Sequence, residues 1–292
     1  MLQNSTQPRS GMSAAVVELK LAHSPDSDDA FMFYALATKK IPTGNLAFVH
    51  VLEDIETLNR RAQEEVYDIT AVSFHAYADL ADHYMLMSCG ASFGDGYGPI
   101  VVTRASLAGE KLKGKRVAIP GKKTTAYLAL CLYEPDIETV EARFDEILDK
   151  VVKGEADAGV VIHEGQLTYG SYGLAKMVDL GAWWRNETGL PLPLGGNVIR
   201  RALDPETIHR ADSLLRASIA YGLEHREEAL EYALHFARGL EPATAEHFVS
   251  MYVNEWTLDY GEKGRQAVQT LLDRGYQAGI IPHAIKAEFV GQ

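Results

Sequence analysis

The chain has 292 residues, a hydrophobic content of 47% and a formal net charge of −12 at pH 7. This length exceeds the usual range of a single hydrophobic core, so two lobes are expected. The negative charge argues against a nucleic-acid or anionic-membrane partner, but it leaves an anionic small molecule open because site electrostatics are local. The two cysteines, Cys89 and Cys131, are too few for a disulfide framework.

The first residues predict a leader that lies outside the fold. Residues 1–16 are polar and lack the apolar segment of a secretory signal, so we expect a disordered leader, with Met12 as a second candidate start. The sequence contains no run of about 18 apolar residues, so it predicts no membrane-spanning helix. We therefore expect a soluble cytoplasmic protein, either a monomer or a homodimer.

Short apolar runs alternate with helical patterns through the first two thirds of the chain, and helical patterns dominate from residue 205 onward. Strands that alternate with helices are joined by crossover connections, so this order predicts an α/β fold with parallel sheets. The predicted strands cover residues 19–22, 46–51, 69–72, 84–87, 100–103, 116–119, 139–143, 158–162 and 176–179. The predicted helices cover residues 30–37, 126–132, 144–152, 206–224, 226–237, 243–252 and 261–278.

Two stretches rich in glycine and proline, residues 90–99 and 189–196, predict connections between lobes. About one hundred residues lie between them, enough for a core of their own. We therefore predict that residues 1–99 and 201–292 form lobe one and that residues 100–200 form an inserted lobe two. This layout resembles two-lobed solute-binding proteins, which hold a small ligand in the cleft between the lobes.

Three predicted strand-to-helix turns carry hydroxyl side chains: Ser24, Ser73, and the pair Thr124 and Thr125. A helix start has unpaired N–H groups and partial positive charge, so it can hold a carboxylate or a phosphate. Helix capping explains each turn taken singly. Because ligands collect at the carboxyl ends of strands in open α/β sheets, the three turns together favour one binding cleft for an anionic small molecule.

His163 directly follows the predicted strand at residues 158–162. An imidazole changes charge near neutral pH, and here it stands where a ligand would lie, so His163 is the candidate proton-transfer group. A structural histidine bonded to a loop carbonyl is the alternative. The other histidines, His75 among them, are given no role.

Five further side chains have two interpretations each. For Asp28 and Asp29 we favour a role as negative charge at a helix start over metal ligation, because no matching set of ligands is apparent. No Cys/His cluster in the sequence has zinc-ligand spacing. Trp183 and Trp184 favour core packing over stacking on a ligand ring. Asn59 is either a polar group of the cleft or a surface residue.

Several segments together resemble the 1,4-dihydroxy-6-naphthoate synthases of the futalosine route to menaquinone. The most specific motifs are Thr124-Thr125-Ala126-Tyr127 and Ile162-His163-Glu164. The resemblance covers nearly all of residues 17–275, and it is carried by residues 23–34, 52–59, 121–127, 144–164, 179–184 and 189–195.

The resemblance implies a two-lobed α/β fold of the type II periplasmic-binding-protein-like class with a ligand cleft between the lobes. It implies lysis of cyclic dehypoxanthine futalosine, with 1,4-dihydroxy-6-naphthoate as the product and with no metal or organic cofactor. By this resemblance His163 is the catalytic base, and Asn59, Ser73, Thr124 and Thr125 match family positions that line the cleft. Together with Ser24, whose turn is expected to face the same cleft, they are the predicted substrate-binding residues.

The chain departs from the family pattern at two places. Residues 25–29 replace a Pro-Cys-Pro-Asn-Asp turn found in some members, and Gly165 stands where a serine is common. These departures keep two other functions open. One is chorismate dehydratase, which acts in the same pathway, and the other is a non-catalytic small-molecule binding protein.

Overall fold

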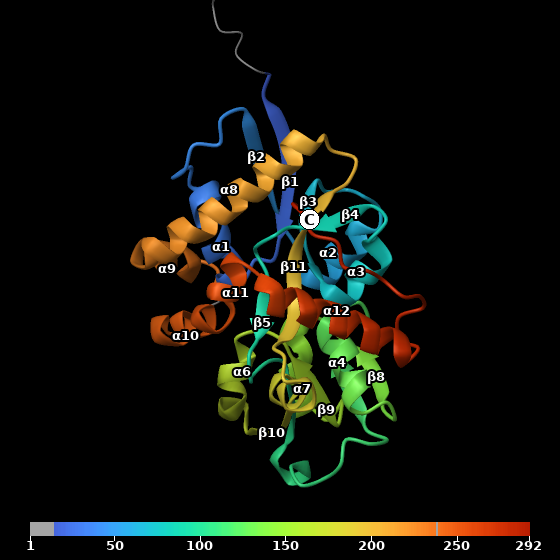
Figure 1. Ribbon diagram of the computed structural model, residues 1–292. Helices are drawn as coiled ribbons and strands as arrows, with labels where there is room; N and C mark the ends of the chain where they lie inside the picture. The colour runs from blue at the N-terminus through green and yellow to red at the C-terminus, as the bar shows by residue number, and fades with distance from the viewer. Residues whose placement is uncertain (1–14, 238) are drawn as a thin grey trace, which may run out of the picture.

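A computed structural model describes residues 15–237 and 239–292 of the chain (Figure 1). It contains two β-sheets, one in the upper half of Figure 1 and one in the lower half, with helices packed around both. The predicted leader lies almost wholly outside the described residues, which begin at Ala15. The mixed α/β architecture confirms the predicted fold class.

The first sheet has the strand order β2-β1-β3-β11-β4, with β5 also paired to β11. Strands β1, β2 and β3 are parallel, whereas β11 is antiparallel to β3, β4 and β5. The strands are β1 (Val17–His23), β2 (Leu46–Leu52), β3 (Ile69–Ser73), β4 (Tyr84–Leu86), β5 (Ser92–Gly94) and β11 (Leu192–Arg200), and the helices that follow the parallel strands are α1 (Ser27–Ala37), α2 (Ile55–Ala62) and α3 (Phe74–Leu80).

The second sheet has the strand order β10-β6-β9-β7-β8. Strand β7 is parallel to β8 and β9, and β6 is antiparallel to β9 and β10. The strands are β6 (Ile100–Arg104), β7 (Arg116–Ile119), β8 (Glu138–Glu141), β9 (Ala158–Val161) and β10 (Leu174–Asp179), and the helices of this part are α4 (Thr125–Tyr133), α5 (Ile147–Val152), α6 (Gly165–Thr168) and α7 (Leu180–Thr188). Short 3₁₀ turns cover Ala105–Leu107, Phe144–Glu146 and Tyr169–Tyr172.

The C-terminal third is helical, as predicted, up to residue 277. Helix α1 packs against α8, α9 and α10, while α12 runs across the middle of the molecule between the two sheets (Figure 1). These helices are α8 (Pro205–Glu224), α9 (Arg226–Leu234), α10 (Pro242–Tyr252), α11 (Glu255–Leu258) and α12 (Gly261–Gln277). Asp204 begins α8 by accepting a hydrogen bond from the Thr207 amide at 2.9 Å, with Pro205 at the first helical position.

The crossing between the two halves is a two-stranded ribbon, because β5 pairs with the first residues of β11. β5 lies in the first of the two stretches for which connections between lobes were predicted, and β11 begins in the second. Their antiparallel course also makes the first sheet mixed rather than parallel. Where the ribbon meets α7, Gly181 is required because a Cβ atom there would lie 1.8 Å from the carbonyl oxygen of Tyr97.

The lobe boundaries after residues 99 and 200 stay a prediction. Strand β11 spans Leu192–Arg200 and pairs within the first sheet, although those boundaries assign it to the inserted lobe. The predicted helix at residues 144–152 is a 3₁₀ turn followed by α5. Gly159 of β9 lets α5 approach, since a Cβ atom there would meet the Ile147 side chain at 2.5 Å.

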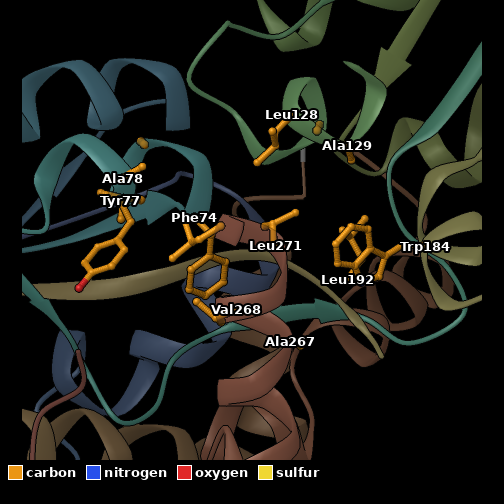
Figure 2. Close-up of a cluster of buried hydrophobic side chains, with 14 of the residues drawn as sticks. Phe74, Tyr77, Ala78, Leu128, Ala129, Trp184, Leu192, Ala267, Val268 and Leu271 are labelled. Atoms are coloured by element: carbon orange, nitrogen blue, oxygen red, sulfur yellow. The ribbon is translucent and has the colours of Figure 1, made fainter. Parts of the chain in front are cut away.

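One apolar cluster joins elements of both halves (Figure 2). Phe74 and Tyr77 from α3, Leu128 from α4, and Leu271 from α12 belong to it, and all four are fully buried. Trp184 of α7 also belongs to this cluster, and its indole N–H donates a hydrogen bond to the carbonyl oxygen of Pro191 at 3.2 Å. Core packing is therefore the correct interpretation of Trp184.

Replacing Trp184 with alanine is expected to lower the free energy of unfolding by about 3–5 kcal/mol, because it leaves a cavity where α7 meets the rest of the cluster. Urea denaturation followed by circular dichroism measures this. Glu187→Ala, at an exposed position on the same helix, is the control, with an expected change within about 0.5 kcal/mol. A Trp184→Ala midpoint equal to that of the control would contradict this account of the core.

Candidate active site

A cavity of about 130 Å³ lies between the two sheets, at the carboxyl ends of β1, β3, β7 and β9. Residues from both halves and from α10 line it. The lining residues are Ser24, Asp26, Asp28, Asp29, Met32, Ile55, Ala71, Val72, Ser73, Gly90, Ser92, Pro99, Thr124, Thr125, Ala126, Ile162, Gln166, Leu194, Gly195, Gly196, Asn197, Phe248 and Tyr252. The three predicted hydroxyl-bearing turns therefore meet at one cavity.

The turn after β1 is held by its own acidic side chains. The Ser24 amide donates a hydrogen bond to Oδ2 of Asp29 at 2.7 Å, and the Ser24 hydroxyl donates one to Oδ2 of Asp26 at 2.6 Å. Asp26 is the N-cap residue of α1 by position, yet its side chain makes no capping hydrogen bond. The carboxyl groups of this turn therefore organise the cavity wall rather than cap the helix.

Ser73 ends β3 and is held from behind by Asn59 of α2. The Asn59 side chain accepts a hydrogen bond from the Ser73 amide at 2.9 Å and donates one to the Ser73 hydroxyl at 3.1 Å. Ser73 lines the cavity, whereas Asn59 is fully buried beneath it and is not a lining residue. Asn59 is therefore neither a surface residue nor a wall residue, and its contact is with Ser73.

The start of α4 forms the opposite wall. The Thr124 hydroxyl caps the helix by accepting from the Tyr127 amide at 3.2 Å, and it donates to the Gly121 carbonyl at 2.7 Å. The Thr125 hydroxyl accepts from the amide of His75, at 3.2 Å. Helix geometry leaves the amides of Thr125 and Ala126 without partners inside the helix, so they can bind an anion in the cavity.

His163 follows β9 at the same edge, and in the chain it stands between the lining residues Ile162 and Gln166, but it is not itself a lining residue. The Gly165 amide donates a hydrogen bond to Nδ1 at 3.0 Å, so the ring proton is assigned to Nε2, which donates to the carbonyl oxygen of Phe144 at 3.0 Å. This bond to a loop carbonyl is the one expected of a histidine with a purely structural role. The proton-transfer role of His163 stays a prediction.

Two hydrogen bonds close the cavity between the halves. The hydroxyl of Tyr252 on α10 donates to Oε1 of Gln166 on α6 at 2.8 Å, and the hydroxyl of Ser27 donates to Oε1 of the buried Glu164 at 3.3 Å. Burial raises the pKa of Tyr252 well above its usual range, so this hydroxyl keeps its proton at neutral pH. These contacts join the two halves beside the cavity.

The charges of the cavity wall are acidic. Asp26, Asp28 and Asp29 line it, and no lysine or arginine does so among the described residues. Burial raises the pKa of Asp29 to about 7 and that of Asp28 well above its usual range, and the neighbouring carboxyl groups raise both further. Asp28 is therefore part of the cavity, whereas the sequence favoured a role limited to helix-start charge.

Sequence analysis missed several residues of this wall. His75, which had no predicted role, is not a lining residue itself, but its Nδ1–H donates a hydrogen bond to the carbonyl oxygen of the lining residue Thr124 at 3.3 Å. Three other lining residues lie on helices: Gln166, Phe248 and Tyr252. No local sequence pattern predicts that these helices contribute to a cavity. Asn197 of β11 lines the cavity, and its buried Oδ1 has no hydrogen-bond partner among the described groups, so a donor on a ligand would satisfy it.

Other candidates lie elsewhere. Lys123 pairs with Asp79, and Lys122 lies 3.7 Å from Glu141 at an exposed site. Trp183 packs edge-on against Tyr133, away from the cavity lining. Within residues 15–237 and 239–292, no three His, Cys, Asp or Glu side chains are arranged to hold a metal ion. No helix in the same ranges is long and apolar enough to cross a membrane.

Solved structures define the class of the protein. The chain is similar to the alkanesulfonate-binding protein of Xanthomonas axonopodis pv. citri, with a TM-score of 0.71, 14% identity, and coverage of 94% of this chain and 97% of that one. The class is thus the two-lobed periplasmic-binding-protein fold. A protein of Archaeoglobus fulgidus gives a TM-score of 0.86 at 47% identity, covering 90% of this chain and 98% of that one.

Sequence comparison identifies the family. A profile described as menaquinone biosynthesis matches residues 19–277, and the chain belongs to this family of enzymes. It is 43% identical to a 1,4-dihydroxy-6-naphthoate synthase of Thermus thermophilus, over 93% of this chain and 99% of that protein. It is 37% identical to a protein of the same name from Streptomyces coelicolor, over 90% of this chain and 95% of that protein.

Replacing Asn59 with alanine is expected to lower the free energy of unfolding by about 1–3 kcal/mol, because the buried Ser73 amide and hydroxyl lose their partners. Thermal or urea denaturation measures the loss. Asn186→Ala, at an exposed position on α7, is the matched control. If Asn59→Ala were as stable as the control, Asn59 would not be the support of Ser73 that its contacts indicate.

Proposed function

We propose that this enzyme of menaquinone biosynthesis cleaves cyclic dehypoxanthine futalosine to 1,4-dihydroxy-6-naphthoate and a sugar-derived fragment, with His163 as the general base. The observation that carries the proposal is the identity of 43% to a synthase of that name across nearly the whole of both chains. The cavity between the two sheets supports it, because polar groups from seven separate segments converge there on one small space.

The proposed reaction begins with removal of a substrate proton by the neutral imidazole. The electron pair left behind drives cleavage of a carbon–carbon bond, and aromatisation of the naphthoate product supplies driving force. General-base catalysis of this kind contributes roughly 10²–10⁴ in rate. The two hydrogen bonds that close the cavity, Tyr252 to Gln166 and Ser27 to Glu164, keep water from the reacting centre.

The proposal places a specific demand on His163. Its Nδ1 accepts the Gly165 amide and its Nε2 faces the Phe144 carbonyl, so neither nitrogen is directed at a substrate in the described geometry. To take a proton, Nδ1 must release the Gly165 amide as the ring turns toward Ile162 and Gln166. Catalytic hydrogen bonds often form only when the substrate binds, so this role is compatible with the geometry seen without substrate.

The substrate is expected to be an anionic small molecule, held without basic side chains. The amides at the start of α4, beside Thr124 and Thr125, would bind a carboxylate through the helix dipole. The Ser73 and Ser24 hydroxyls would bind the polar groups that face the other wall. The orphan Oδ1 of Asn197 would accept a hydrogen bond from a substrate hydroxyl.

The test is to incubate the purified protein with cyclic dehypoxanthine futalosine and, separately, with chorismate, and to follow product formation by mass spectrometry. We expect the naphthoate product from the first substrate and no turnover of the second. Conversion of chorismate alone would replace the proposal with chorismate dehydratase. Binding of either compound without conversion would favour a non-catalytic binding protein.

His163→Ala is expected to lower kcat by about 10²–10⁴, because the general base is lost. His209→Ala is the control, since His209 is exposed on α8 and remote from the cavity lining. Equal thermal midpoints for the two variants would show that the loss is catalytic. A His163→Ala enzyme with a wild-type rate would leave only the structural role of this histidine.

A further inference from the structure

The wall of the cavity is acidic, although the proposed substrate is an anion. Asp26, Asp28 and Asp29 line the space, Glu164 reaches its edge from the other half, and the described lining residues include no lysine or arginine. Four ionised carboxyl groups this close together would repel one another and any carboxylate that enters. At least one of them must therefore be neutral when substrate is bound.

The hydrogen bonds of the turn decide which carboxyl group is neutral. Oδ2 of Asp29 accepts the Ser24 amide at 2.7 Å, Oδ2 of Asp26 accepts the Ser24 hydroxyl at 2.6 Å, and Oε1 of Glu164 accepts the Ser27 hydroxyl at 3.3 Å, so each of these three side chains is engaged by a serine. Asp28 lines the cavity itself, and the other three carboxyl groups all disfavour it as an anion, so we assign the proton to Asp28.

We propose that Asp28 is a neutral carboxylic acid that donates a hydrogen bond to an anionic oxygen of the substrate, and so takes the place of the basic side chain that the cavity lacks. This role for Asp28 rests on the proposed function, and it makes Asp28 a substrate-binding residue. A protonated acid suits this task because it attracts an anion by donating a hydrogen bond. It adds no positive charge, and a positive charge here would be neutralised by the neighbouring carboxylates.

The groups that surround Asp28 set its pH dependence. Asp26 and Asp29 face it from its own turn and helix, Glu164 faces it from the second half, and Tyr252 faces it from α10. Tyr252 is neutral, so the charged neighbours are all acidic. The raised pKa means that the acid form predominates at neutral pH and is lost as the pH rises, and affinity for the substrate is lost with it.

The experiment compares Asp28→Asn, Asp28→Ala and the wild type across pH 6–10. An amide has the shape of the protonated acid and keeps a donor, so Asp28→Asn is expected to hold KM within about threefold of the wild type at neutral pH. Asp28→Ala lacks the donor and is expected to raise KM about tenfold to a hundredfold with a smaller change in kcat. Asp149→Asn, an exposed carboxyl-to-amide change on α5, is the control.

The pH profile separates this role from a purely structural one. In the wild type KM should rise on the alkaline side, and in Asp28→Asn that rise should be absent, because an amide does not ionise. If Asp28→Asn binds as poorly as Asp28→Ala, the negative charge is required and the proposal is overturned. An alkaline rise of KM that is the same in the wild type and in Asp28→Asn would overturn it as well.

Infrared difference spectroscopy gives a readout that needs no turnover. The wild-type spectrum minus the Asp28→Asn spectrum at pH 7 should contain the carbonyl band of a protonated carboxyl group, and its absence would overturn the proposal. If the wild type converts no cyclic dehypoxanthine futalosine, the proposed function has failed. The Asp28 role fails separately, when the wild type is active and either the pH profile or the infrared band contradicts it.

Discussion

The apolar cluster shared by α3, α4, α7 and α12 is the constraint on which the site depends. It joins the two sheets on one side through fully buried side chains such as Phe74, Leu128 and Leu271, and the cavity lies where the parallel strands of both sheets end. Because close-packed interiors resist deformation, this contact fixes the distance between the cavity walls. The polar turns then face one another, and a few hydrogen bonds, such as Ser27 to Glu164, add to the contact between the halves.

Closing the halves has an electrostatic consequence. The Tyr252–Gln166 and Ser27–Glu164 contacts join the halves beside the acidic turn after β1, where burial and the neighbouring carboxyl groups make Asp28 and Asp29 harder to ionise. The wall then presents hydroxyls, helix amides and a neutral acid in place of positive charge. Binding by such preorganised dipoles suits a chemistry in which negative charge moves during the reaction, because a dipole does not trap the anion as an ion pair would.

The family and fold together explain how an enzyme uses the architecture of a binding protein. Relatives in fold, at 11–15% identity, share only the two-lobed plan, whereas the menaquinone-biosynthesis family shares sequence along almost the whole chain. In this chain a cavity lies between the two halves of that plan. Catalysis then requires few added groups, and His163 stands one residue beyond the wall at Ile162.

The sequence by itself determined the class of fold, the family, most strands and helices, and the three hydroxyl-bearing turns. These features leave local patterns: hydrophobic periodicity, residues that begin helices, and motifs such as Thr124-Thr125-Ala126-Tyr127. Only the tertiary structure decided how β5 and β11 pair with each other and with the first sheet, because their partners are distant in the chain. It also decided that Asn59 lies beneath Ser73, that both nitrogens of the His163 ring contact backbone groups, and that Asp28 shares one cavity with Glu164 and Tyr252. Those relations join residues far apart in the chain, and the protonation state of a carboxyl group depends on neighbours that no local pattern encodes.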